Sequence, residues 1–324
     1  MIYLRIARSL TLAVLLVAPI ADAAHAQRPL TAREGFVNVP GGPVWYRIFG
    51  SGTKTPLLIV HGGPGSRSCA YDPLAELVSH NRPVVVYDQL GTGRSGRPSD
   101  RSLWTVDRSV RELAAVRKAL GLTRIHLMGH SWGGALVAEY AIKTRPQGIE
   151  SLVLAGPLLS TEIWIQDANA LRALLPVDVQ KVLTRNEAAG TTKSPEYEAA
   201  TNLFYQRFLV HQANVSSPPS CAGSPRNDEI YQLMWGPTEF RATGSLVGFD
   251  VTHDLGKLHM PILFLVGRYD EARPETVARF QALIPGAQLH IFENSGHMAP
   301  LEEANEYSQV LEDLFKRVDQ TSDR

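Results

Sequence analysis

One short stretch of the sequence has the residue types and spacing of a serine nucleophile. Residues 129–133 read Gly-His-Ser-Trp-Gly, after an apolar run at 125–128 and before a helix-like segment at 135–141. A G-x-S-x-G motif between a strand and a helix is typical of a nucleophile elbow, where the serine lies on a tight turn. The N–H groups at the start of the helix then point toward charge that develops nearby. The motif therefore predicts Ser131 as a nucleophile.

A serine hydroxyl needs a base, and the base needs a group that orients it. Asp270 and His297 follow Ser131 in the chain order Ser, Asp, His that is typical of the α/β-hydrolase fold. Each lies in a loop just after an apolar, strand-like run. Of the ten histidines, His297 alone follows a late strand, beside glycine and after a strand-end aspartate. We expect His297 to take the proton of Ser131 and Asp270 to orient the imidazole.

A glycine-rich loop predicts the groups that would stabilise an oxyanion. Residues 61–65, His-Gly-Gly-Pro-Gly, follow a buried apolar run at 57–60. Such a loop can bring backbone N–H groups close to a substrate carbonyl. The N–H groups of Gly63 and of Trp132, the residue after the nucleophile, are the predicted donors. A tight turn without a ligand is the alternative, and no lysine is placed as in a phosphate-binding P-loop.

The elements around these residues predict a mostly parallel central sheet with helices on both faces. Buried strand-like runs alternate with helical patterns up to about residue 157. From 158 to 247 no buried strand run occurs, and helical segments are expected near 168–175 and 196–210. We interpret 158–247 as an inserted helical lid over the carboxyl ends of the strands, where α/β sheets place their sites. The core would then consist of 27–157 and 248–324, in an α/β-hydrolase fold.

The N-terminus has the pattern of a secretory signal peptide. Arg5 and Arg8 precede an almost unbroken apolar run, and Ala24-His25-Ala26 supplies a small-x-small cleavage site. We expect residues 1–26 to be removed and the protein to be exported, either periplasmic or secreted. An uncleaved membrane anchor is the alternative.

Composition bears on three further questions: nucleic-acid binding, disulfide bonds and metal sites. Lys+Arg and Asp+Glu both total 32, so the zero net charge gives no reason to expect nucleic acid as a partner. Two cysteines, Cys69 and Cys221, exclude a disulfide framework or a multi-cysteine metal site. Two free, partly buried thiols are the expectation, although an exported protein can join them. No metal and no organic cofactor are implied.

Taken together, the motifs resemble the proline iminopeptidase family of α/β-hydrolases, which includes tricorn-interacting aminopeptidases and amino-acid amidases. The matching stretches run in order along the chain and include the lid: 61–65, 88–95, 129–134, 235–240 and 267–271. In this family carboxylates hold the free α-amino group of the substrate, and the resemblance implies that role for Glu239 and Glu271. Without the resemblance, we would interpret both glutamates as acidic loop residues with a structural role.

The resulting hypothesis is a serine aminopeptidase that acts through an acyl-enzyme. It would act on short peptides, or amino-acid amides and esters, with a free N-terminus. An esterase, lactonase or acyl-transferase with the same three residues is the alternative, and a catalytically silent binding protein is a rival of another class. Epoxide hydrolase or dehalogenase chemistry is disfavoured, because the elbow carries Ser131 rather than an aspartate. The sequence does not decide whether proline or a broader set of N-terminal residues is preferred. It does not decide the oligomeric state either.

Overall fold

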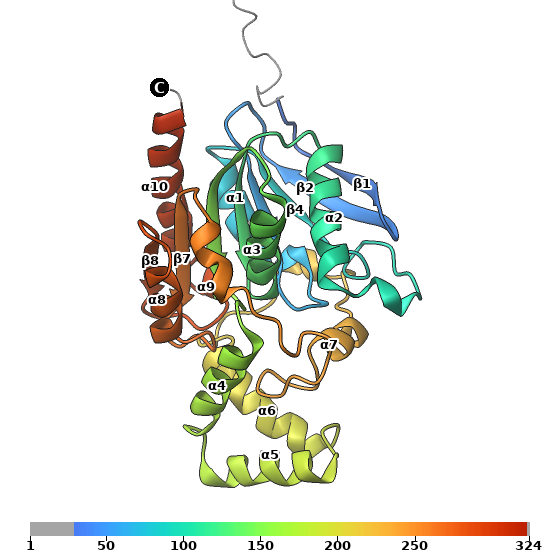
Figure 1. The fold of residues 1–324 in the computed structure, drawn as a ribbon. Coiled ribbons are helices and arrows are strands. Elements are labelled where there is room, and N and C mark those ends of the chain that lie inside the picture. The colour runs from blue at the N-terminus through green and yellow to red at the C-terminus, as the bar shows by residue number, and fades with distance from the viewer. Residues whose placement is uncertain (1–28, 323–324) are drawn as a thin grey trace, which may run out of the picture.

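The computed structural model describes residues 29–322, which form one eight-stranded sheet with helices on both faces (Figure 1). The strand order is β1-β2-β4-β3-β5-β6-β7-β8. β2 is antiparallel to both of its neighbours, and all pairs from β4 to β8 are parallel. The strands are β1 (Arg33–Val39), β2 (Gly42–Phe49), β3 (Leu57–Val60), β4 (Val84–Tyr87), β5 (Ile125–His130), β6 (Ile149–Ala155), β7 (Ile262–Gly267) and β8 (Gln288–Phe292). The predicted fold class is confirmed.

Side chains alternate between the two faces of each central strand, which explains the unbroken apolar runs. In β3, Leu58 and Val60 belong to one buried cluster, and Leu57 and Ile59 belong to the other. α2, α3 and α8 cover the first face, and α1 and α10 cover the second. The bounds are α1 (Asp72–Ser79), α2 (Val106–Ala119), α3 (Trp132–Thr144), α8 (Pro274–Ala282), α9 (Ala299–Glu302) and α10 (Ala304–Ser322).

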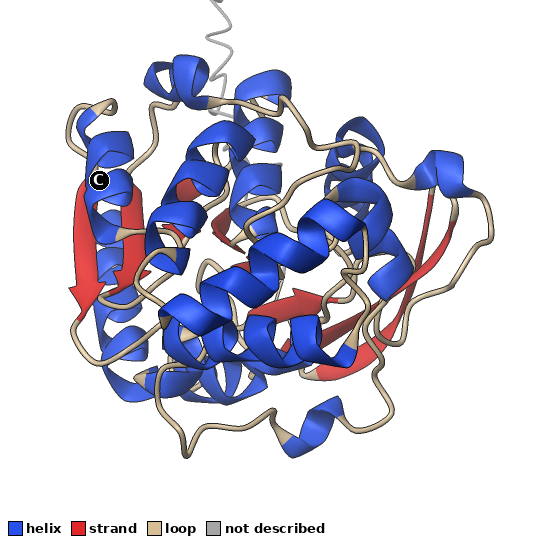
Figure 2. Cartoon of the chain, turned by 90° about the horizontal axis from the view of Figure 1, so that it is seen from below, coloured by secondary structure: helices blue, strands red, loops and turns tan. Residues whose placement is uncertain are grey.

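Four further helices lie between β6 and β7 and form the lid. They are α4 (Thr161–Arg172), α5 (Val177–Ala189), α6 (Pro195–Phe208) and α7 (Asp228–Met234). In Figure 1 they lie below the sheet, and Figure 2 shows them from below, in front of the strands. The helix expected near 168–175 is instead α4, which begins seven residues earlier at Thr161. The reason is local, because the side chain of Ser160 accepts the Ile163 N–H and starts the helix there.

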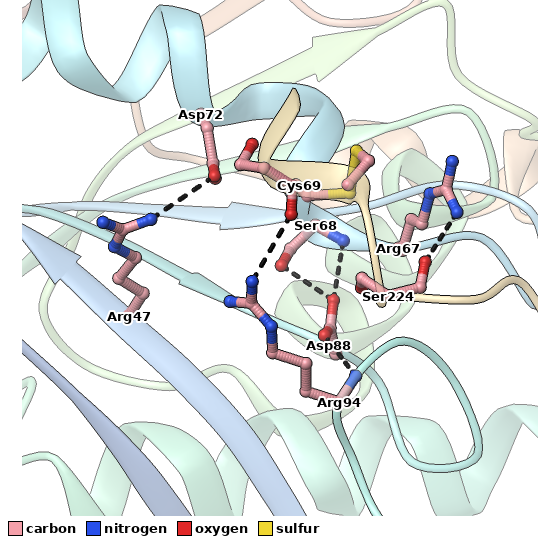
Figure 3. Close-up of a disulfide and its surroundings, with 10 residues drawn as sticks. Arg47, Arg67, Ser68, Cys69, Asp72, Asp88, Arg94 and Ser224 are labelled. Carbon is pink, nitrogen blue, oxygen red and sulfur yellow. Dashed lines mark hydrogen bonds and ion pairs between the residues drawn. A yellow bond between two sulfur atoms is a disulfide. The ribbon is translucent and has the colours of Figure 1, made fainter. Parts of the chain in front are cut away.

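A disulfide joins the lid to the core, so the expectation of two free thiols is wrong. Cys69 lies in the short helix η1 (Ser68–Tyr71), and Cys221 lies in η3 (Pro219–Cys221) of the lid. Their Cα atoms are 5.3 Å apart although 152 positions separate them in the sequence. Figure 3 shows the bond and the polar contacts around it, with Asp88 accepting from the backbone and hydroxyl of Ser68. The pairing depends on how the lid folds back, which spacing alone does not reveal.

The predicted signal peptide, residues 1–26, lies outside the described residues. Within residues 29–322, no helix is both long enough and apolar enough to cross a membrane.

Candidate active site

Ser131 lies on the sharp turn that the glycines of its motif predict. Its φ is +56°, a conformation that non-glycine residues rarely adopt. A Cβ on Gly129 would lie 2.2 Å from the Gly133 carbonyl oxygen, and one on Gly133 would lie 2.2 Å from the Val60 oxygen. The turn therefore needs glycine at both flanking positions, and it presents Ser131 at the start of α3.

Asp270 and His297 are in contact, and both are buried. The distance from His297 Nδ1 to Asp270 Oδ1 is 2.7 Å, and the same oxygen accepts the Ala272 N–H at 2.8 Å. Burial acts to lower the pKa of His297, but the charge and hydrogen bond of Asp270 outweigh it, so this pKa is raised. The carboxylate thus fixes the ring and stabilises its protonated form. Ser131 and His297 line the same cavity.

The loop that carries His297, residues 295–298, is bonded to the lid as well as to the core. The His297 N–H donates to the Phe208 oxygen and the Met298 N–H to the Leu209 oxygen, both at 3.0 Å. The His297 oxygen lies 2.8 Å from Nε2 of His130, the residue before Ser131. The C-terminal end of α6 therefore helps to set the position of the imidazole.

Glu302, which the sequence reasoning missed, links these two regions through its side chain. One carboxylate oxygen accepts the Gly296 N–H at 2.8 Å, and the other accepts the Gln212 N–H at 2.6 Å. Gly296 precedes His297, while Gln212 follows α6. No local pattern marks this acid, because one of its two partners, Gln212, comes from a distant loop of the lid.

Gly156 and Trp164 also contact the Asp270–His297 pair and were not singled out in the sequence. A Cβ on Gly156 would lie 2.9 Å from both Asp270 Oδ2 and His297 Nδ1, so a larger residue would displace them. The Trp164 ring packs edge-on against the imidazole, with centroids 5.6 Å apart. A glycine directly after a central strand is a signal that could have marked Gly156; nothing in the sequence marks Trp164.

The structure places Gly63 and Trp132 beside Ser131. Val60 pairs with Gly129 across neighbouring strands, so the loop 61–65 and the elbow leave the sheet at the same edge. A Cβ on Gly62 would lie 2.9 Å from the Ser131 Cβ, and Gly63 has a φ of +119°. The N–H of Trp132 belongs to the first turn of α3, where backbone donors lack partners within the helix. Gly63 lines the cavity with Ser131 and Trp132 directly follows Ser131, so their N–H groups stay the predicted oxyanion donors.

Gln89 holds the two walls of this region together. Its side-chain amide donates to the His61 oxygen at 2.7 Å and accepts the Trp132 indole N–H at 3.1 Å. The Gln89 backbone N–H donates to His61 Nε2 at 3.0 Å. Asp88 accepts from Ser68 and from the Arg94 N–H, as expected for a residue that holds loops.

Glu239 and Glu271 lie in the same cavity as Ser131. Glu271 is 1% exposed, and its Oε1 is 3.9 Å from His297 Nε2, while its Oε2 has no hydrogen-bond partner among the described residues. Burial raises its pKa well above the ordinary value, and the charges of Glu239 and Asp270 add to this shift. Burial also raises the pKa of Glu239, whose Oε1 accepts the Tyr231 hydroxyl at 2.6 Å. The charge of Glu239 thus adds to the cost of ionising Glu271, and a cation bound beside them would favour the charged form of both acids.

The cavity is small, with a volume of about 100 Å³. Its apolar lining includes Tyr71, Tyr231 and Leu209. The cavity is not lined by Trp132, Met234, Trp235 and Phe240, which are buried in the hydrophobic core. Within residues 29–322, no group of histidine, cysteine and acidic side chains could hold a metal ion.

The class of protein follows from this fold and site. A family model described as the alpha/beta hydrolase fold matches residues 55–304. The chain is 42% identical over 290 residues to a proline iminopeptidase of Heyndrickxia coagulans, covering 88% of this chain and 99% of the relative.

Two solved structures are similar over nearly the whole described chain. The structure of a proline iminopeptidase from Mycobacterium smegmatis has a TM-score of 0.79 at 31% identity, covering 90% of this chain and 100% of that one. The structure of VinJ has a TM-score of 0.82 at 35% identity, covering 88% and 99%. This chain therefore belongs to the proline iminopeptidase family of α/β-hydrolases. It is an enzyme, a hydrolase of the aminopeptidase class.

Proposed function

We propose that the enzyme releases the N-terminal residue of short peptides or amino-acid amides through an acyl-enzyme on Ser131. The observation that carries this proposal is one cavity that combines Ser131 and His297 with two acids, Glu239 and Glu271, the second of which has an oxygen without a hydrogen-bond partner among the described residues. The first two residues suit acyl transfer, and the acids suit a substrate with a positive charge.

In the proposed acylation step, Ser131 Oγ attacks the carbonyl carbon of the first residue while His297 Nε2 takes the hydroxyl proton. The same proton then passes to the leaving nitrogen as the C–N bond breaks. In the second step His297 takes a proton from water, whose oxygen attacks the ester carbonyl carbon. The imidazolium then returns this proton to Ser131 Oγ as the ester C–O bond breaks, which releases the amino acid and restores the free serine. Asp270 accepts from Nδ1 throughout, which keeps Nε2 free for both transfers and stabilises the imidazolium.

The backbone N–H groups of Gly63 and Trp132 would hold the oxygen that becomes negative in both steps. Such donors stabilise the transition state more than the ground state, and removing one costs roughly 10²–10³-fold in rate. They come from the two loops that leave the sheet together.

Glu239 and Glu271 would bind the α-ammonium of the substrate, whose pKa near 8 keeps it mostly charged at neutral pH. Binding a cation favours the charged form of both acids and offsets the cost of burying them. An acylated N-terminus has no charge to offer, so it would be rejected. The small cavity favours a compact first residue, and the names of the similar proteins suggest proline.

We also propose that residues 1–26 direct export, to the periplasm or outside the cell. The Cys69–Cys221 bond supports this proposal, because disulfides persist in oxidising compartments and are rare in the cytosol.

The test of the proposed function compares kcat/KM on fluorogenic amides of proline, alanine and leucine with the same amides N-acetylated, with p-nitrophenyl acetate alongside. Cleavage of the free-amine amides alone supports the proposal. Cleavage of the ester but of no amide would reject it and place the enzyme with esterases. Ser131→Ala should abolish turnover of all these substrates while the protein stays folded.

A further inference from the structure

Arg226 brings a permanent positive charge to the cavity that holds Ser131. It lines this cavity with Glu239, Glu271 and His297, and it is the one lysine or arginine among the described lining residues. Within residues 29–322 its guanidinium has one ion-pair contact, a 4.0 Å approach to Asp228, whose side chain is 87% exposed. A pair this long and this solvated contributes little, so the charge of Arg226 is available to a ligand.

Three neighbouring arginines differ from Arg226, because each donates a hydrogen bond to the lid. Arg67 donates to the Ser224 oxygen at 2.6 Å (Figure 3), Arg97 donates to the Pro225 oxygen at 2.7 Å, and Arg101 pairs with the Glu229 side chain. All three come from the core and hold the lid segment 219–229. Arg226 belongs to that segment, and its side chain lies at the cavity instead.

The backbone next to Arg226 is fixed relative to Ser131. The Asn227 N–H donates to the Gly65 oxygen at 2.8 Å, and the Asn227 side chain donates to the Gly91 oxygen at 2.9 Å. Gly65 ends the loop that carries Gly63. The Cys69–Cys221 bond holds the same segment five residues earlier. The backbone beside Arg226 is therefore bonded to the loop 61–65, which also carries Gly63, a proposed oxyanion donor.

We propose that Arg226 binds the C-terminal carboxylate of the substrate, so that di- and tripeptides with both ends free are the preferred class. This inference rests on the proposed function. A guanidinium matches a carboxylate with two parallel hydrogen bonds. Each residue extends a peptide by at most about 3.3–3.6 Å, so the ends of a di- or tripeptide lie within roughly 7–11 Å of each other. The ammonium would then lie in the cavity at Glu239 and Glu271, and the carboxylate at Arg226, whose side chain is 51% exposed.

Electrostatics supports a short distance between Arg226 and Glu239. Burial raises the pKa of Glu239, and among the opposing effects is the charge of Arg226, which places the two groups within electrostatic reach of each other. A zwitterionic peptide supplies a partner of opposite sign to each of them. A peptide with a blocked C-terminus would leave Arg226 without one.

The experiment measures kcat/KM on prolyl-alanine and on prolyl-alanine amide, which differ only in the C-terminal charge. We expect the wild-type enzyme to prefer the free acid by about 3- to 10-fold, a range set by the half-exposed position of the arginine. Arg226→Gln should bring the ratio close to one, and Arg226→Lys should retain part of it. Arg185→Gln is the matched control. It removes the same charge from an exposed position on α5, where Arg185 pairs with Glu196, so it should keep the wild-type ratio.

Two results would overturn the inference: a wild-type enzyme that cleaves both dipeptides equally well, or an unchanged ratio in Arg226→Gln. In either case the aminopeptidase assignment would stand, because both substrates are cleaved. If neither dipeptide is cleaved while p-nitrophenyl acetate is, the proposed function itself fails, and the role of Arg226 fails with it.

Discussion

Asp270 and Glu271 are neighbours in one loop, yet their carboxylates are in opposite electrostatic situations. Asp270 accepts from His297 and from the Ala272 N–H. Glu271 has one oxygen with no hydrogen-bond partner among the described residues, and its pKa is raised well above the ordinary value, chiefly by burial. The first carboxylate has hydrogen-bond partners before any substrate arrives. The second lacks that compensation, and an incoming cation would supply it.

The two parts of the cavity also differ in how they are assembled. Asp270, His297 and Ser131 all lie in loops at the carboxyl ends of strands of a single sheet. The acid pair combines Glu271 from the core with Glu239 from the lid. The three catalytic residues therefore all come from the core, whereas the amine site also needs the lid to supply Glu239. Variants in the two parts should separate these roles.

The largest effect is expected from His297→Ala. Without the imidazole, Ser131 has no base and the leaving group has no acid, so both steps are lost for every substrate. We expect kcat to fall by about 10⁴-fold or more for amides and for p-nitrophenyl acetate alike. Steady-state kinetics on both substrates checks this, and a large loss on only one of them would contradict a shared nucleophile.

A smaller and more selective effect is expected from Glu239→Gln and Glu271→Gln. Each removes one charge from the amine site but leaves Asp270 and His297 in place. We expect kcat/KM for amides with a free amine to fall by about 10²–10³-fold, given 2–5 kcal/mol for truncating one side of a buried charge pair. Turnover of p-nitrophenyl acetate, which has no amine, should change far less. Equal losses on the two substrates would show that these acids act in the chemistry instead.

Glu302→Gln tests whether the lid positions the imidazole. The glutamine amide nitrogen cannot accept from a backbone N–H, so either Gly296 or Gln212 loses its partner. We expect kcat to fall about tenfold on both substrates, as for one lost hydrogen bond to a charged group, with little change in KM. Glu306→Gln is the control, because Glu306 is exposed and contacts His290 rather than the loop 295–298. A change in KM alone would argue against a positioning role.

The smallest effect is a shift in the pH profile. Asp270 and, more weakly, Glu239 raise the pKa of His297 against the opposing effect of burial. A raised pKa keeps the imidazole protonated, and inactive as a base, to higher pH. Ester turnover should therefore rise with pH through a pKa above that of free histidine. In Glu239→Gln this rise should move to lower pH, because one of the charges that raises the pKa is gone; a rise at unchanged pH would contradict the coupling.

The local parts of the molecule could be predicted well from the sequence. The elbow around Ser131 and the glycine loop at 61–65 depend on turn chemistry and periodicity within a few residues. The lid helices were less accurately predicted. The start of α4 was missed, and α5 and α7 were not identified, because most of the stability of such helices comes from tertiary packing rather than from a clear local pattern.

The sequence by itself determined the fold class and the family, because short-range patterns and the order of the motifs along the chain carry that information. Only the tertiary structure decided that Cys69 meets Cys221, that Glu302 joins α6 to the loop of His297, and that Arg226 faces the cavity. Each of these contacts joins segments that are far apart in the sequence. Their formation depends on how the lid folds back over the sheet, and no local preference specifies that.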